Sequence, residues 1–315
     1  MSESKGKVAI VGSGLIGSCW ATLFVSARYS VCLYDISLNQ LEAAKQTVLK
    51  NLQKLKSEGL SRGTTTLEEA PQRITTTMKL NEALAGAIYA QESTCEDVEF
   101  KKKIFTEMDQ YASPSTILAS STSTIPASKF TEGLAHRSQC LVAHPVNPPL
   151  YLTLVEMVPA PWTDAKVMAK ACEIMESIGQ EPVRLHHEVL GFAVNRLQYA
   201  LLAEAWRLVG DNVLSPEDVD KVMSAGLGPR YAIHGPLQTV HLNANGIRDY
   251  FVRYGDGIRQ VLADMGPTPT FKETAVVETL ESSLNHAMPL DQLPAMKLER
   301  ERNLARIASL KKKMD

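Results

Sequence analysis

The stretch Val8-Ala9-Ile10-Val11-Gly12-Ser13-Gly14-Leu15-Ile16-Gly17 decides the fold of this 315-residue chain. Its four apolar residues predict a strand buried on both faces, and the glycines predict a tight turn into a helix. Gly12 permits the turn, Gly14 lets a pyrophosphate approach the backbone, and Gly17 permits close packing of helix on strand. The phosphates would meet the amide groups and the positive end of the helix dipole. We therefore assign the loop to a dinucleotide through Gly12, Gly14, Leu15, Ile16 and Gly17.

The acidic residue Asp35 follows a second apolar run, Val31–Tyr34, eighteen residues after Gly17. A carboxylate at this place can accept hydrogen bonds from both hydroxyl groups of the adenosine ribose. It would repel a 2′-phosphate, and no arginine follows in Ile36-Ser37-Leu38. The expected cofactor is therefore NAD and not NADP.

Short apolar runs alternate with helical periodicity from residue 7 to about residue 187. Further strand-like runs stand at Ile117–Ala119, Cys140–Ala143 and Leu154–Val158, and helix candidates at 97–112 and 164–179. This alternation predicts an α/β fold with a Rossmann-type doubly wound sheet over residues 1–188. The polar segment 38–72 is longer than a simple crossover, so we expect an inserted helical hairpin there.

The strand signal fades after residue 188, and helical periodicity replaces it. Residues 192–209 place Leu197, Leu201, Ala205 and Leu208 on one helical face. The segment Ser215-Pro216-Glu217-Asp218 combines a capping hydroxyl, a proline in the first turn and acids near the positive end of the dipole. We expect residues 189–315 to form a second, all-helical domain.

Composition excludes several classes of function. The chain has 33 basic and 35 acidic residues, so it lacks the basic excess of a protein that binds nucleic acid through phosphate contacts. No apolar run approaches the ~20 residues of a membrane span, and the first residues lack the apolar region of a signal peptide, so we expect a cytosolic protein. Five scattered cysteines without a Cys-x-x-Cys pair, and histidines without metal spacing, predict neither a disulfide framework nor a metal site.

A histidine and a glutamate stand in two consecutive apolar runs. His144 ends the run at 140–143, and Glu156 interrupts the run at 152–158, where a carboxylate is costly without a partner. An imidazole on an adjacent strand would be that partner, and ligands of open α/β sheets bind at strand ends. The pair predicts His144 as a general base whose tautomer Glu156 fixes. A purely structural ion pair is the alternative.

Two other polar features are candidates for the same site. The hydroxyl cluster Ser120–Thr124 follows a strand, where it forms either a capped turn or a hydrogen bond to a reacting oxygen. Asn195 is polar within an otherwise apolar stretch at the start of the second domain. It could close the site from that side.

Together these segments resemble the 3-hydroxyacyl-CoA dehydrogenase family over nearly the whole chain. Five motifs occur in the family's order: the Gly12–Gly17 loop, the Ser120–Ser123 run, His144-Pro-Val-Asn-Pro, Leu154-Val-Glu-Met-Val and Gly191-Phe-Ala-Val-Asn-Arg-Leu. The resemblance implies His144 as catalytic base and Glu156 as its partner, with Ser123 and Asn195 as hydrogen-bonding groups at the substrate oxygen.

The same resemblance adds residues that periodicity does not single out. It implies that Glu96 and Lys101, which otherwise read as surface charges at a helix start, lie near the ribose and the nicotinamide, and that Asp35 binds the adenosine ribose. Asn147, inside the His144 motif, is taken as a further substrate contact. The family also implies a homodimer formed through the helical domain.

One segment departs from the acyl-CoA enzymes of this family. Here the chain reads Gly226-Leu-Gly-Pro-Arg230-Tyr-Ala, where those enzymes have a glycine- and proline-rich turn without arginine. A guanidinium matches a carboxylate, whereas a thioester offers it no charge. We expect Arg230 to bind the carboxylate of a free 3-hydroxy acid. A surface arginine near a helix end is the alternative.

The expected activity is NAD-dependent oxidation of a small 3-hydroxy acid, and the resemblance within the family implies L-gulonate, oxidised at C3. A 3-hydroxyacyl-CoA dehydrogenase and an L-carnitine dehydrogenase are the enzymatic alternatives. A non-catalytic structural protein and a nucleotide-sensing module are the alternatives from other classes. We expect a small-molecule substrate as partner, and neither nucleic acid nor a membrane.

Overall fold

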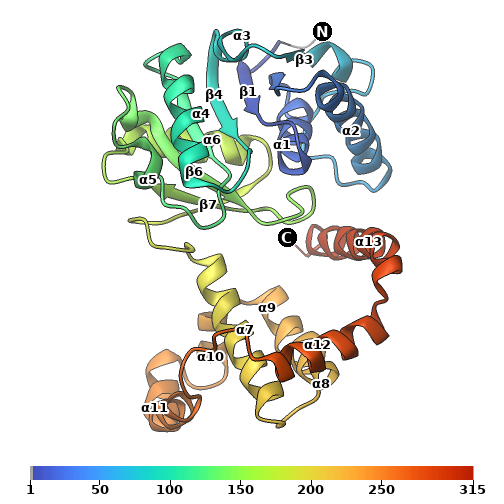
Figure 1. The fold of residues 1–315 in the computed structure, drawn as a ribbon, viewed down its shortest axis with the longest axis vertical. Coiled ribbons are helices and arrows are strands. Elements are labelled where there is room, and N and C mark those ends of the chain that lie inside the picture. Colours follow the sequence, from blue (N-terminus) through green and yellow to red (C-terminus); the bar gives the residue numbers. More distant parts are fainter. Residues whose placement is uncertain (1–2, 315) are drawn as a thin grey trace. The chain divides into compact units, whose positions relative to one another are not determined.

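The computed structural model describes residues 3–314 and contains one eight-stranded sheet (Figure 1). Its strands are β1 (Lys7–Val11), β2 (Ser30–Tyr34), β3 (Ile74–Thr77), β4 (Ala87–Glu92), β5 (Ile117–Ser120), β6 (Cys140–Pro145), β7 (Leu154–Pro159) and β8 (Glu181–Arg184). They lie in the order β3-β2-β1-β4-β5-β6-β7-β8, and every neighbouring pair is parallel except β6 with β7. The predicted α/β, Rossmann-type doubly wound sheet is confirmed.

Helices pack on both faces of the sheet. They are α1 (Leu15–Ser26), α2 (Leu38–Ser57), α3 (Leu80–Leu84), α4 (Val98–Tyr111), α5 (Ser128–Thr131), α6 (Ala165–Ser177) and α13 (Leu293–Lys311). One apolar core includes side chains of α1, α2, α6 and α13, and a second includes side chains of α3, α4 and α5. Val8 and Ile10 of β1 enter the first core, and Ala9 and Val11 enter the second. This alternation is why residues 8–11 of β1 are all apolar.

The strand order reverses beside β1. The chain passes from β1 outward to β2 and β3 on one side, and then returns to β4 on the other side of β1. In open α/β sheets, ligands bind at the carboxyl ends of the strands where the order reverses. The residues that follow β1, β2, β4, β5 and β6 are therefore placed where a ligand would bind.

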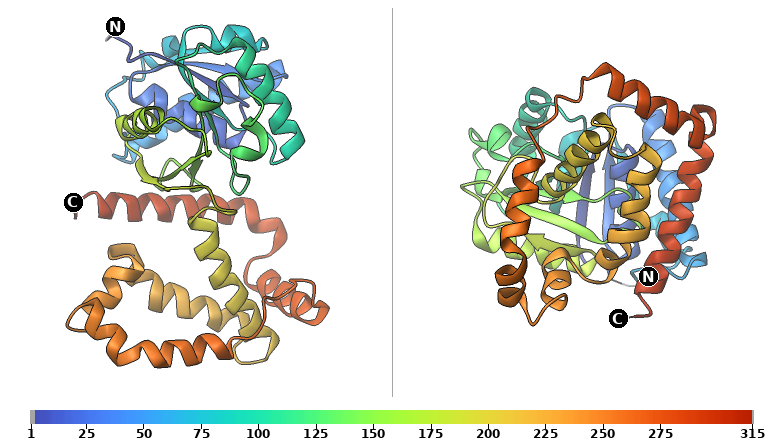
Figure 2. Two further views of the ribbon diagram at one scale, coloured as in Figure 1. Left: turned by 90° about the vertical axis from the view of Figure 1, so that its left-hand side faces the viewer. Right: turned by 90° about the horizontal axis from the view of Figure 1, so that it is seen from below.

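The residues divide by their contacts into two units. The first is the described part of Met1–Asn195 and Leu298–Asp315, and the second is Arg196–Lys297. Residues 196–297, all of which are described, contain helices and no strand (Figure 2). The helices that follow β8 are α7 (Val194–Gly210), α8 (Pro216–Lys221), α9 (Gly228–Ile233), α10 (Pro236–Leu242), α11 (Ile247–Asp264) and α12 (Thr274–Ala287). The expected helical character of this region is confirmed.

Most of the last helix, α13, belongs to the first unit. Leu304, Ala305 and Ala308 of α13 pack on the core that contains α1 and α2. We expected all of residues 189–315 to form one helical domain, whereas the contacts group residues from 298 onward with the sheet. The domain division at residue 188 stays a prediction.

The helical hairpin expected within residues 38–72 is wrong. The segment forms the single helix α2, a loop, and a 3-10 helix at Ala70–Arg73. Gly59, with φ of 70°, takes the left-handed conformation after α2 ends. A Cβ added at Gly63 would lie 1.9 Å from the carbonyl oxygen of Ser26, so the loop runs directly against the end of α1. The loop is held there by Thr65, whose amide donates to the carbonyl oxygen of Ser26 and whose hydroxyl donates to that of Val25.

Candidate active site

The glycine loop between β1 and α1 has the geometry of a dinucleotide cradle. Gly12 has φ of 95°, and a Cβ there would lie 2.7 Å from the carbonyl oxygen of Ser93. A Cβ on Gly17 would lie 2.0 Å from the carbonyl oxygen of Gly12, so only glycine allows α1 to start this close to the strand. At Gly14 a Cβ would meet nothing within 4 Å. The loop is therefore open at the position where a pyrophosphate approaches.

The acid at the end of β2 is held toward this loop. Asp35 accepts hydrogen bonds through Oδ2 from the amide and hydroxyl of Ser13, at 3.0 and 2.9 Å, and through Oδ1 from the amide of Ser37 at 3.2 Å. Within the described residues no side chain caps the N-terminus of α1, so its first amide groups remain available to an anion. Leu15, the first residue of α1, is exposed. These residues fit a dinucleotide with its diphosphate at α1 and a ribose at Asp35.

His144 and Glu156 are directly opposite each other on neighbouring strands. The antiparallel register of β6 and β7 pairs the two residues, and Nδ1 of His144 lies 2.7 Å from Oε2 of Glu156. His144 is 7% exposed and Glu156 is 1% exposed. Among the described residues, the second ring nitrogen of His144, Nε2, has no hydrogen-bond partner. The ring is thus oriented through Nδ1, and Nε2 is the atom that can exchange a proton with a ligand.

The second oxygen of Glu156 binds the start of α7. Oε1 accepts hydrogen bonds from the amides of Ala193 and Val194, at 2.7 and 2.9 Å. Burial raises the pKa of Glu156, but the hydrogen bonds from His144, Val194 and Ala193 outweigh that effect and hold the pKa below its ordinary value. Glu156 is therefore an ionised carboxylate beside the imidazole.

Asn195, at the start of α7, contacts Ser123, in the loop after β5. The side-chain Nδ2 of Asn195 donates to the carbonyl oxygen of Ser123 at 2.8 Å. Asn195 is buried, whereas Ser123 is exposed. The neighbouring Phe192, with its ring centroid 5.8 Å from that of His144, is fully buried and has φ of 51°. The hydroxyl of Ser123 and the amide of Asn195 thus come from segments that are hydrogen-bonded to each other.

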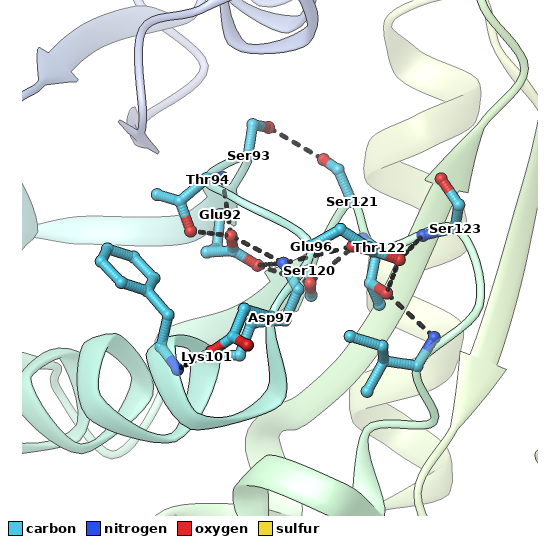
Figure 3. Close-up of polar contacts among 12 residues, drawn as sticks. Glu92, Ser93, Thr94, Glu96, Asp97, Lys101, Ser120, Ser121, Thr122 and Ser123 are labelled. Carbon is cyan, nitrogen blue, oxygen red and sulfur yellow. Dashed lines mark hydrogen bonds and ion pairs between the residues drawn. The ribbon is translucent and has the colours of Figure 1, made fainter.

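A carboxylate-rich network joins the ends of β4 and β5, as Figure 3 shows. Oε1 of Glu96 accepts hydrogen bonds from the hydroxyl of Thr122 and from the amides of Ser123 and Thr124. Lys101 lies 3.7 Å from Glu96 and 3.0 Å from Glu92, with 1% of its side chain exposed. From the residues alone, Glu96 and Lys101 read as surface charges at a helix start. In the structure they are paired with each other, and Lys101 is buried.

Sequence reasoning missed Glu92. This residue ends β4 and is fully buried, although it carries a carboxylate. The signal that could have found it is the one that found Glu156, a carboxylate adjoining an apolar stretch (Ala87-Ile-Tyr-Ala-Gln-Glu92). The strand ends in two polar residues, which weakens its apolar pattern.

Two predicted substrate residues lie outside these networks. Asn147 is exposed in the loop after β6, where the Asn147–Pro148 peptide bond is cis. Arg230 lies in α9 of the second unit and is exposed, and the structure gives it no ion pair within residues 3–314. The geometry brings together a different set: His144, Glu156, Asn195, Ser123, Glu96 and Lys101.

Three further findings concern metals, thiols and membranes. Among residues 3–314, no group of three or more His, Cys, Asp or Glu side chains is placed to hold a metal ion. All five cysteines are free thiols. In the same part of the chain, no helix combines the length and apolarity needed to cross a bilayer.

Comparisons with known proteins found matches to both parts of the chain. Residues 7–189 match the model of the 3-hydroxyacyl-CoA dehydrogenase NAD binding domain, and residues 191–280 match that of its C-terminal domain. The lambda-crystallin homolog of Homo sapiens is 45% identical over 312 residues, which is 98% of each chain. The L-carnitine dehydrogenase of Staphylococcus epidermidis is 34% identical over 81% of this chain and 78% of its own.

A solved structure is similar over almost the whole length. It is that of 5-formyl-3-hydroxy-2-methylpyridine 4-carboxylic acid 5-dehydrogenase, an NAD+-dependent dismutase. The TM-score is 0.83 with 25% sequence identity, and the match covers 96% of this chain and 97% of the other. The similarity thus includes both the sheet-containing unit and the helical one.

Proposed function

Since the chain belongs to the 3-hydroxyacyl-CoA dehydrogenase family of NAD-dependent oxidoreductases, we propose that it oxidises L-gulonate at C3 to 3-dehydro-L-gulonate. The observation that carries the proposal is the 2.7 Å contact between His144 and Glu156. His144 lies near the end of β6, which is separated by β4 and β5 from β1, the strand that precedes the glycine loop. The choice of L-gulonate rests on the resemblance within the family and on Arg230.

His144 acts as the general base. Its Nε2 takes the proton of the C3 hydroxyl, while Glu156, bound to Nδ1, stabilises the imidazolium that forms. The hydroxyl of Ser123 and the amide of Asn195 hold the substrate oxygen during this transfer. Bound NAD supplies the hydride acceptor. Burial of the pair excludes water that would otherwise compete for the proton.

The cofactor residues divide between its two halves. Gly12, Gly14, Leu15, Ile16 and Gly17 hold the diphosphate, and Asp35 holds the adenosine ribose and disfavours a 2′-phosphate. On the nicotinamide half we place Glu96. Lys101 acts through Glu96, because its own ammonium is buried.

For the substrate we propose Arg230 as the group that binds the carboxylate, and Asn147 as a further contact. A free acid is favoured over a CoA ester because thioesters offer no charge to a guanidinium. Two of the three similar proteins named above act, by their names, on carnitine and on a pyridine carboxylic acid. This observation keeps L-carnitine as the second candidate substrate.

A purely structural role is the remaining alternative, since curated relatives are named lambda-crystallins. The complete set of His144, Glu156, Ser123 and Asn195 argues against a role that is only structural.

We also propose that the chain forms a homodimer through its helical unit. Its exposed apolar side chains support this, among them Leu237, Leu242, Phe251 and Val252.

One assay panel tests the proposed substrate. The protein is given L-gulonate, L-carnitine, 3-hydroxybutyrate and a 3-hydroxyacyl-CoA, each with NAD and with NADP, and formation of the reduced cofactor is followed. We expect the highest kcat/KM for L-gulonate with NAD. Turnover of the thioester with no turnover of any free acid would reject the free-acid substrate, and no turnover at all would favour the structural role.

A further inference from the structure

Glu92 is a fully buried carboxylate to which the proposed function gives no task (Figure 3). Its oxygens accept two hydrogen bonds from Lys101, each at 3.0 Å, one from the amide of Thr94 at 2.7 Å, and one each from the hydroxyls of Thr94 and Ser120. All of these groups are donors, so the site is built for an ionised carboxylate and not for an amide.

Lys101 lies between two carboxylates at unequal distances. Its Nζ is 3.0 Å from Glu92 and 3.7 Å from Glu96, and the lysine side chain is 1% exposed. The three residues carry two negative charges and one positive charge. Because Lys101 is paired more closely with Glu92, the net negative charge of the cluster resides mainly on Glu96, whose side chain is 42% exposed.

We propose that Glu92 sets the preference between the oxidised and the reduced cofactor: by pairing with Lys101 at the shorter distance, it leaves the charge of Glu96 only partly compensated at the nicotinamide half. The ring of NAD+ carries a positive charge and that of NADH carries none, so a negative carboxylate favours NAD+. The inference rests on the placement of Glu96 in the proposed function. It makes Glu92 a positioning residue, which acts through Lys101 and Glu96.

The test uses isothermal titration calorimetry to measure the Kd values of the full chain for NAD+, NADH and ADP-ribose. In Glu92→Gln, Lys101 is free to pair more closely with Glu96 than the 3.7 Å of the wild type. The ratio of Kd for NAD+ to Kd for NADH should then rise about threefold to tenfold. ADP-ribose, which lacks nicotinamide, should bind as it does to the wild type. An equal loss of affinity for all three ligands would overturn the inference, because it is the result of a merely structural role.

Two further variants separate charge from structure. Lys101→Met removes the positive charge, so the same ratio should fall below that of the wild type. The double variant Glu92→Gln/Lys101→Met keeps Glu96 as the sole charge of the cluster and should restore the wild-type ratio. If Glu92→Gln does not fold, a lower ratio in Lys101→Met and a wild-type ratio in the double variant still support the inference. A ratio that rises in Lys101→Met would overturn the inference.

Controls identify which proposal fails. Glu99→Gln removes an exposed carboxylate of α4 that pairs with Lys102 at 2.8 Å, and it should keep the wild-type ratio. Glu96→Gln should raise the ratio as Glu92→Gln does. If Glu96→Gln leaves the ratio unchanged, the placement of Glu96 and the inference both fail. If Glu96→Gln raises the ratio and Glu92→Gln does not, only the inference fails.

Discussion

At the scale of single residues, Glu156 serves two segments at once. One oxygen orients the ring of His144, and the other binds the amides of Ala193 and Val194 at the start of α7. The same carboxylate therefore fixes the proposed base and the helix start that carries Asn195. A change at this residue should affect both stability and the chemistry.

The pKa of Glu156 predicts how its contribution depends on pH. Because the folded-state pKa lies below the ordinary 4.5, ionised Glu156 stabilises the fold above that pH, and this stabilisation is lost as the pH falls through the folded-state pKa. Glu156→Gln should lower the free energy of unfolding by about 2 kcal/mol at neutral pH, and by less in acid. Urea unfolding of both proteins over this pH range measures the difference. A difference that stays constant would show that the ionised form has no such role; Glu132→Gln, an exposed carboxylate, is the control.

Arg230 makes a prediction about substrate affinity. Arg230→Met should raise KM for L-gulonate about tenfold to a hundredfold, because a charge-assisted hydrogen bond to a carboxylate is lost. KM for NAD should stay the same. Steady-state kinetics measures both, with Arg259→Met, an exposed arginine of α11, as control. An unchanged KM for the acid would remove Arg230 from the substrate site.

Single site residues could be predicted where a charged side chain stands in a run of residues that is otherwise apolar and therefore buried. His144 and Glu156 could be paired from the residues alone, because a carboxylate inside an apolar run needs a partner. The contacts of Glu96 with the 122–124 loop could not, since they join the ends of two strands whose adjacency only the sheet order gives. Glu92 has the same signal as Glu156, but its strand ends in two polar residues, which weakens the apolar pattern around it.

At the scale of elements, the β1–loop–α1 unit allows a matched pair of substitutions. Gly17→Ala puts a methyl group 2.0 Å from the carbonyl oxygen of Gly12, so it should destabilise the fold by about 2–3 kcal/mol and abolish NADH binding. Gly14→Ala meets no atom within 4 Å, so it should fold as the wild type does. It should still weaken NADH binding about tenfold, or about 1.4 kcal/mol, because the methyl group meets the pyrophosphate.

Thermal unfolding and NADH titration of both variants check this pair. Normal NADH affinity in Gly14→Ala would mean that the diphosphate does not lie at the loop. Normal stability in Gly17→Ala would mean that α1 can move away from β1, contrary to the packing observed.

Elements could be predicted where both faces of a strand are buried. β1, β2, β5, β6 and β7 are mainly apolar with buried central residues, and all five were expected. The other strands lack this pattern: β3 reads Ile-Thr-Thr-Thr at one edge, β8 reads Glu-Pro-Val-Arg at the other, and β4 ends in polar residues. Edge strands tolerate exposed and proline residues, so their periodicity is weak.

At the scale of the whole molecule, the helical unit exposes much apolar surface. Leu237, Leu242 and Phe251 line one groove of α10 and α11, and each is more than half exposed. Light scattering should give about twice the 34.6 kDa of one chain. Phe251→Glu should shift the protein toward the monomer, whereas Glu132→Gln should not. A monomer at all concentrations would reject the proposed homodimer.

The return of α13 to the sheet could not be predicted from the sequence. Its contacts through Leu304, Ala305 and Ala308 join residues more than a hundred positions apart, and local periodicity carries no information about such pairs. The helical character of this region was evident from its periodicity, whereas the unit to which each helix belongs depends on tertiary packing.

In this account, the imidazole of His144 is the general base for every turnover of the substrate. The most direct measurement is kcat for NADH formation from L-gulonate in His144→Gln, together with its Kd for NADH. The matched control is His136→Gln, which breaks another histidine–carboxylate pair, with Asp109 at 3.0 Å. We predict that kcat falls about 10²- to 10⁴-fold in His144→Gln alone, with NADH binding retained. Near-normal kcat in His144→Gln would contradict the account.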